Sequence, residues 1–154
     1  MRVGYVICHN DIATKITVCK QVNDVHTNLL FQMSCHKFMT EFDLDAHVKK
    51  IRELYKRKSA LMMSRLDEIG AERIEYTKTD GGLFIWASLP ECNDHDGFVK
   101  TLAQKKLCVV PGRTFNCDIN EPSYGFRLNY STPTDGQIIK GVEILKNTIN
   151  EIRG

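Results

Sequence analysis

The sequence predicts a chain of the α/β class whose second half, residues 44–154, folds as an α+β domain with a small mixed sheet covered by helices. Three observations predict this fold class. Apolar side chains recur at helical spacing over residues 44–69, and beyond Gly70 their period changes from about 3.6 to 2. The patterns that follow then run in the order strand, strand, helix, strand, strand, helix, which is typical of a small sheet covered by helices.

The overall composition is that of an ordinary globular protein. Of the 154 residues, 42% are hydrophobic and 26% are charged, and the formal net charge is +2, so neither nucleic acid nor a membrane is required as a partner. The N-terminus lacks the long apolar stretch of an export signal, and the six cysteines are irregularly spaced without a CxxC motif. We therefore expect a cytoplasmic protein with reduced thiols and no metal site.

The first 43 residues carry one strand pattern and two helix patterns. Residues 2–8 are apolar and rich in strand-forming residues, which predicts a buried strand. Asn10 and Asp11 can cap a helix that ends near Val22, and a second helix is expected over residues 28–39.

The longest predicted element is a helix over residues 44–69. Asp43 stands at its N-cap position and Gly70 just past its end. At about 1.5 Å per residue this helix is roughly 39 Å long, a length that suits a link between two domains. Its many basic residues favour either a polyanion-binding face or a solvated face with acidic residues interspersed. The apolar stripe comprises Leu44, Val48, Ile51, Tyr55, Met62, Leu66 and Ile69.

The remaining elements are shorter and are separated by turn signals. Thr134 and Gln137 fit a capping box at the start of the last helix. The turn Thr79-Asp-Gly-Gly82 separates two strand patterns. The expected elements are strands over 73–77 and 83–89, a helix over 95–105, a buried strand over 107–110 that ends at Pro111-Gly112, a strand over 124–131 and the final helix.

Arg127 lies inside the strand pattern of residues 124–131. Because side chains alternate along a strand, Arg127 shares a polar face with Asn129 and Ser131. The apolar face comprises Phe126, Leu128 and Tyr130. A guanidinium binds a carboxylate through two parallel N–H donors. Arg127 is therefore a candidate for binding a carboxylate ligand, and the alternatives are an ion pair with an internal Asp or Glu, or simple exposure.

Four short motifs occur in a fixed order along the chain: Arg-Val-Gly-Tyr at 2–5, Gly-Gly-Leu-Phe-Ile-Trp at 81–86, Val-Val-Pro-Gly at 109–112 and Phe-Arg-Leu-Asn-Tyr-Ser at 126–131. Together they resemble the C-terminal part of pyridoxal-phosphate (PLP) aminotransferases of class I/II, fold type I. Within this family the similarity is greatest to the aminoadipate/kynurenine-like branch. The effector domain of MocR-type transcription regulators belongs to the same branch.

This resemblance implies roles for several residues. Arg127 matches the arginine that binds the α-carboxylate of the substrate, and Arg2 matches the arginine that binds the PLP phosphate. Five further residues are candidates for contacts at the active site or the dimer interface, namely Gly81, Gly82, Thr27, Asn28 and Asn129. The resemblance also implies that residues 1–43 are a remnant of the large PLP-binding domain and that residues 44–154, with the linking helix 44–69, are the small domain.

The chain departs from the family pattern in one respect. The Schiff-base lysine, which in this family lies shortly before the Arg-x-Gly-Tyr stretch, has no counterpart in the 154 residues. Ser34-Cys-His-Lys37 offers the spacing Ser-x-x-Lys, but it lies after Arg2 and inside a predicted helix. The resemblance therefore implies that the complete enzyme binds PLP. It also implies that this fragment alone binds no PLP and does not turn over substrate.

The resemblance leaves three functions open. The first is the C-terminal part of an aminotransferase, which transfers an amino group between an amino acid and a 2-oxo acid and works as a homodimer or in association with a missing N-terminal part. The second is the ligand-sensing domain of a MocR-type regulator. The third is a non-catalytic, stand-alone binding domain.

Overall fold

The computed structural model of the chain describes residues 2–90, 92–118 and 120–153. It divides into two compact units, Met1–Lys50 and Ile51–Gly154. The boundary between the units falls inside the long helix α3, Leu44–Asp67.

The first unit consists of helices, as its spacing of apolar residues predicts. Helix α1 spans Asn10–Asn23 and helix α2 spans Leu29–Glu41. The N-cap of α1 is His9, whose ring accepts from the backbone N–H of Asp11, and not Asn10 or Asp11 as expected. The N-cap of α2 is Asn28, whose side chain accepts from the backbone N–H of Phe31 at 3.3 Å. Both predicted helices are thus confirmed, with a shift at the start of the first.

The buried strand predicted over residues 2–8 is wrong. This segment has no regular secondary structure, and Tyr5 and Ile7 are 87% and 88% exposed. A strand is stable when its backbone groups pair with a neighbouring strand, and all four strands in the described part of the chain lie between Glu75 and Asn129. An apolar, strand-forming sequence therefore stays exposed and without strand structure in this unit, which also buries no side chain of α1 or α2.

Helix α3 begins at Leu44 as the sequence predicts and ends at Asp67, two residues before the predicted end. The Asp43 carboxylate accepts from the backbone N–H of Ala46 at 2.9 Å, and Gly70 adopts a φ of +102° just beyond the helix. Lys58, only 8% exposed, donates to the backbone carbonyls of Ser131 and Pro133 at 2.9 and 2.6 Å. No helix in the described part of the chain, this one included, is both long and apolar enough to cross a membrane.

Three basic residues of α3 have partners within the chain, so they serve the fold of the second unit. Besides Lys58, Arg57 pairs with Asp135, and Arg65 donates to Glu68 at 2.8 Å. These contacts account for Arg57, Lys58 and Arg65 as parts of the fold.

The second unit contains a four-stranded antiparallel sheet. Its strands are β1 Glu75–Tyr76, β2 Phe84–Ser88, β3 Val110–Pro111 and β4 Gly125–Asn129, in the spatial order β1-β2-β4-β3. Every neighbouring pair is antiparallel. The α+β class is confirmed, but the described sheet is antiparallel and not mixed. For β1 and β2 the reason is their short connection, which can join only antiparallel strands.

Strand β3 is shorter and more exposed than expected. Only Val110 and Pro111 pair with β4, and Cys108 is exposed. The reason is its place at the edge of the sheet, where one neighbour suffices and where a proline is tolerated.

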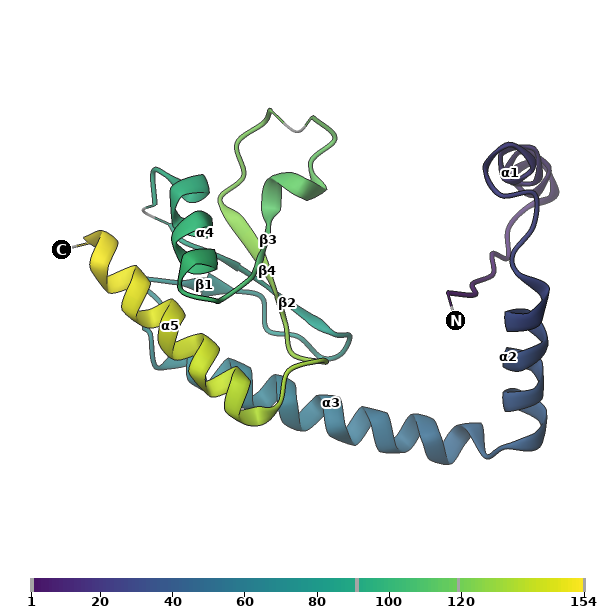
Figure 1. Cartoon of the computed structure of the whole chain (residues 1–154), viewed down its shortest axis with the longest axis horizontal. Coiled ribbons are helices and arrows are strands. Elements are labelled where there is room, and N and C mark those ends of the chain that lie inside the picture. Colours follow the sequence, from purple (N-terminus) through teal and green to yellow (C-terminus); the bar gives the residue numbers. More distant parts are fainter. Residues whose placement is uncertain (1, 91, 119, 154) are drawn as a thin grey trace. The chain divides into compact units, whose positions relative to one another are not determined.

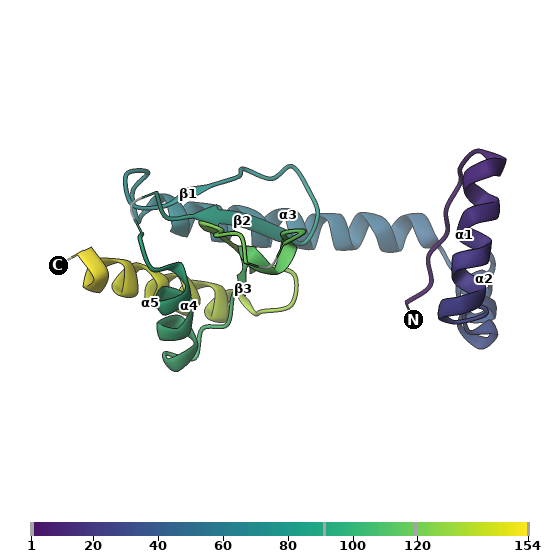
Figure 2. The same cartoon turned by 90° about the horizontal axis from the view of Figure 1, so that it is seen from above.

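One core holds the second unit together. Helix α4, His95–Gln104, and helix α5, Asp135–Arg153, lie side by side in both views of Figures 1 and 2. They pack with the second half of α3 against one face of the sheet. The capping box is confirmed, since Thr134 and Gln137 exchange two hydrogen bonds between side chain and backbone. The core includes Met62, Leu66, Ile85, Ala87, Phe98, Leu102, Phe126, Leu128, Ile138, Leu145 and Ile149.

Candidate functional site

The sheet face turned away from this core is lined by polar, aromatic and small residues. We call it the open face, and its residues are Phe84, Trp86, Ser88, Val110, Gly125, Arg127 and Asn129. The alternation predicted for β4 is confirmed, because Phe126, Leu128 and Tyr130 are buried while Arg127 is half-buried and Asn129 is exposed. Arg127 lies at the centre of this face, with Trp86 opposite it on β2 and Val110 opposite it on β3.

The guanidinium of Arg127 is held by aromatic rings. Its central carbon, Cζ, lies 4.0 Å from the ring centroid of Phe84 and 5.0 Å from that of Phe115. These distances are within the range of cation–π attraction. The Arg127 guanidinium forms no hydrogen bond or ion pair with any residue that the structure describes. The internal ion pair is therefore not found among these residues, and the N–H donors are available to a ligand.

Trp86 packs beside this arginine and depends on two glycines. Its ring meets that of Phe115 edge to face, with centroids 5.8 Å apart. A Cβ atom on Gly125 would lie 2.3 Å from the indole, and one on Gly112 would lie 2.9 Å from it. Because real Cβ atoms do not approach so closely, the indole occupies space that only glycine leaves free at these two positions.

The structure brings the predicted residues Gly81, Gly82 and Asn129 to the same end of the sheet. The Tyr130 hydroxyl donates to the Gly81 carbonyl at 3.2 Å, and Gly82 adopts a φ of +87° that favours glycine. The side-chain oxygen Oδ1 of Asn129 accepts from the backbone N–H and the hydroxyl of Ser131, both at 2.8 Å. Asn129 thus shapes the turn after β4, beside the open face.

Three further predicted residues belong to the first unit. Arg2 is exposed, has a left-handed φ of 57° and forms no contact with a charged partner among the described residues. The Thr27 hydroxyl accepts from the Lys20 ammonium at 3.1 Å, and Asn28 caps α2. Thr27 and Asn28 therefore have local structural roles, and Arg2 is the one of the three that is free to bind an anion.

Sequence reasoning missed the aromatic residues around Arg127. Phe84 and Trp86 were identifiable from alternation within the strand 83–89, since both fall on the face opposite Ile85. Phe115 had no such signal, because it comes from a short 3₁₀ helix, Gly112–Phe115, that follows β3.

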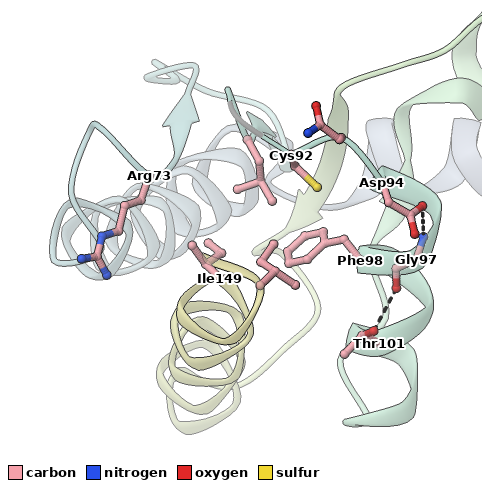
Figure 3. Close-up of a pocket in the computed structure, with 10 residues that line it drawn as sticks. Arg73, Cys92, Asp94, Gly97, Phe98, Thr101 and Ile149 are labelled. Carbon is pink, nitrogen blue, oxygen red and sulfur yellow. Dashed lines mark hydrogen bonds between the residues drawn. The ribbon is translucent and has the colours of Figure 1, made fainter. Parts of the chain in front are cut away.

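A hollow of about 400 Å³ lies elsewhere in the second unit, between the start of α4 and the end of α5 (Figure 3). Its apolar wall includes Phe98 and Ile149, and the Asp94 carboxylate accepts from the Gly97 N–H at 2.8 Å. Burial raises the pKa of the Cys92 thiol above its ordinary value. Because only the thiolate is a good nucleophile, burial disfavours the reactive form of Cys92 in this hollow.

His95 supplies a prediction about stability and pH. Its ring meets that of Tyr124 edge to face at 5.4 Å, and burial lowers its pKa from 6.5, an effect that the Leu89 backbone, Asp94 and Asp96 oppose. The unfolded chain binds this proton more readily, so stability is complete above about pH 6.5 and falls as the pH drops through the lowered folded-state pKa.

We therefore expect the urea midpoint of the wild-type chain to fall between pH 7.5 and pH 5.5 more than that of His95→Gln. Circular dichroism at both pH values measures the difference. Equal falls in the two proteins would contradict a folded state that disfavours the charged ring.

Comparison with known proteins identifies the family and its fold. The sequence pattern of the family described as aminotransferase class I and II matches residues 1–145. This chain belongs to that family. The family resemblance inferred from the four motifs is thus confirmed.

Individual members of the aminotransferase family agree with this assignment. The aromatic-amino-acid aminotransferase 1 of Thermococcus litoralis is 31% identical over 150 residues, which are 97% of this chain and 36% of that protein. The kynurenine aminotransferase of Pyrococcus horikoshii, solved in complex with PMP, superposes with a TM-score of 0.82 at 29% identity, over 94% of this chain and 36% of that one. The chain therefore spans little more than a third of the length of these relatives.

Two other similarities bear on the cofactor and on the alternative function. The α-aminoadipate aminotransferase LysN of Thermus thermophilus, complexed with N-(5′-phosphopyridoxyl)-L-leucine, superposes with a TM-score of 0.83 at 27% identity, over 96% of this chain and 37% of that one. An HTH-type transcriptional regulator of Escherichia coli is 29% identical over 85 residues, which are 55% of this chain and 18% of the regulator. The aminotransferase matches are longer, and they support the enzyme family as the main interpretation.

Proposed function

We propose that these 154 residues are the part of a PLP-dependent aminotransferase that binds the carboxylate of the amino-acid or 2-oxo-acid substrate. The observation that carries this proposal is the state of Arg127. Its guanidinium is half-buried on the open face, lies over two aromatic rings and has no carboxylate partner among the described residues. A substrate carboxylate is the natural partner for a planar donor pair in this state.

Arg127 contributes to the reaction by orientation. A bidentate contact with the substrate carboxylate fixes both the position and the rotation of the amino acid. Fixing the substrate in this way aligns the bond from Cα to hydrogen for removal of the proton. PLP, when bound, supplies the electron-withdrawing group that makes this proton removable.

Arg2 fits the cofactor's phosphate. It is an exposed arginine, it has no charged partner among the described residues, and a guanidinium is a strong phosphate ligand. We propose that Arg2 binds the phosphate and that Thr27 and Asn28, with Gly81, Gly82 and Asn129, contact the active site or the neighbouring subunit.

The domain organisation and the assembly follow from the same proposal. Residues 1–43 are part of the large PLP-binding domain, and residues 44–154 are the small domain with its linking helix. We propose that the protein is a homodimer in the cytoplasm, a compartment in which cysteine thiols stay reduced.

A titration with N-(5′-phosphopyridoxyl)-L-leucine tests the proposed function, because the carboxylate of its leucine part is the group that Arg127 is proposed to bind. Trp86 is the only tryptophan in the chain and lies opposite Arg127, so its fluorescence reports on the open face. We expect saturable quenching by the probe and at least tenfold weaker binding of its carboxamide analogue. Equal binding of the two molecules, or binding of neither, would contradict a carboxylate site at Arg127.

The match to a regulator favours one second candidate, a ligand-sensing domain that uses the same carboxylate contact without catalysis. The reading frame upstream of the Met1 codon distinguishes the two. A Ser-x-Ser-Lys motif without a helix-turn-helix domain indicates the enzyme, and a helix-turn-helix domain indicates the regulator.

A further inference from the structure

We propose that Phe84 and Phe115 are positioning residues, which hold the Arg127 guanidinium ready for a carboxylate without occupying its N–H donors. This inference rests on the proposed function, since it concerns how the same carboxylate site is kept competent. It adds two residues that act through Arg127 rather than on the substrate.

The first step is that Arg127 needs such support. An arginine side chain has many rotamers, and fixing it in one of them costs conformational entropy unless other contacts hold it. Other arginines of the second unit are held by acidic side chains, namely Arg57 by Asp135, Arg65 by Glu68 and Arg113 by Asp96. Arg127 has no such partner among the residues described, and its closest recorded contacts are the two rings.

The second step is that aromatic rings leave the donors free. A carboxylate partner accepts the N–H groups directly, and a substrate would have to displace it. The faces of Phe84 and Phe115 instead attract the positive charge, at 4.0 and 5.0 Å from Cζ. They carry no lone pairs for conventional hydrogen bonds, so all five N–H donors of the guanidinium stay available to an incoming carboxylate.

The third step is that both rings are themselves fixed by the fold. Phe84 lies within β2, paired in register with Asn129 of β4. Phe115 meets the ring of Trp86 at 5.8 Å, and the indole of Trp86 lies close above Gly112 and Gly125. The support for Arg127 is therefore a contiguous set of side chains that ends on the backbone of the sheet.

The fourth step is that neither ring belongs to the hydrophobic core. Phe84 is 38% exposed and Phe115 is 50% exposed, and neither is among the buried core residues. Both rings are thus partly exposed where they contact the Arg127 guanidinium, and neither contributes a fully buried side chain to the core. Their replacement by leucine should accordingly leave the fold intact while changing the arginine.

The experiment compares the whole wild-type chain with Phe84→Leu, Phe115→Leu and the conservative variant Phe115→Tyr. Phe42→Leu is the matched control, because Phe42 is an exposed phenylalanine of the first unit. Isothermal titration calorimetry measures the Kd for N-(5′-phosphopyridoxyl)-L-leucine. Nitrogen-15 relaxation of the Arg127 Nε–Hε group measures the order of the guanidinium in the absence of any ligand, and amide spectra verify the fold.

We expect each leucine variant to bind the probe about three- to tenfold more weakly, with a lower order parameter for Arg127 Nε. Phe115→Tyr and Phe42→Leu should match the wild type in both measurements. Wild-type affinity and wild-type order in both leucine variants would overturn the positioning role and leave the proposed function standing. Failure of the wild-type chain to bind the probe would instead overturn the proposed function, and with it the reason for positioning.

Discussion

Arg127→Lys is expected to weaken binding of N-(5′-phosphopyridoxyl)-L-leucine by about tenfold, and Arg127→Gln by about a hundredfold. Lysine keeps the charge but loses the planar pair of donors that matches a carboxylate, and it also loses the flat contact with Phe84 and Phe115. Glutamine loses the charge as well, which removes a contact of about 2–3 kcal/mol. Calorimetric titration of the three proteins under identical salt conditions measures both ratios.

The matched control for this prediction is Arg65→Gln. Arg65 is also a half-buried arginine of the second unit, but it already donates to Glu68 and lies on α3, not on the open face. Its removal changes the net charge of the chain as Arg127→Gln does, and it should leave the Kd unchanged within twofold. An equal loss of affinity in the two glutamine variants would mean that the probe responds to overall charge and not to a site at Arg127.

The sequence predicted the elements whose signals are local. The caps at Asp43, Gly70 and Thr134 were identifiable because each residue type satisfies a defined set of backbone groups next to itself. The two faces of β4 were identifiable for a similar reason, since alternation is fixed by the geometry of one strand. These local signals were sufficient to place Arg127 on the correct side of the sheet.

What the sequence did not predict depends on contacts between distant residues. Residues 2–8 have the composition of a buried strand, yet burial requires partner strands that the described part of the chain does not provide. The antiparallel order β1-β2-β4-β3 and the approach of Phe115 to Arg127 likewise arise from the path of the chain between strands. Alternation within β4 identifies the arginine, but only the assembled sheet shows what holds it.

Gly125→Ala is expected to lower the free energy of unfolding by about 2–3 kcal/mol, because the new methyl group would overlap the Trp86 indole. Three atoms of the indole lie 2.3, 2.5 and 2.6 Å from the position of that Cβ. The indole cannot move into the sheet, so it must rotate away from Gly125 and Phe115 or push the strands apart. Urea unfolding followed by far-UV circular dichroism measures the loss without relying on tryptophan fluorescence.

A double-mutant cycle with Trp86→Leu identifies the cause of that loss. In the Trp86→Leu background the overlapping indole atoms are gone, so Gly125→Ala should cost less than about 1 kcal/mol, and the two substitutions should be strongly non-additive. Gly136→Ala provides the glycine control, because a Cβ there meets nothing within 4 Å, and in a helix it should be neutral or slightly stabilising. An equal cost of Gly125→Ala with and without Trp86 would show that the glycine is needed for the strand itself. In that case the contact between the indole and Gly125 would not contribute to stability. The series of contacts from Gly125 through Trp86 and Phe115 to Arg127 would then lose its first member.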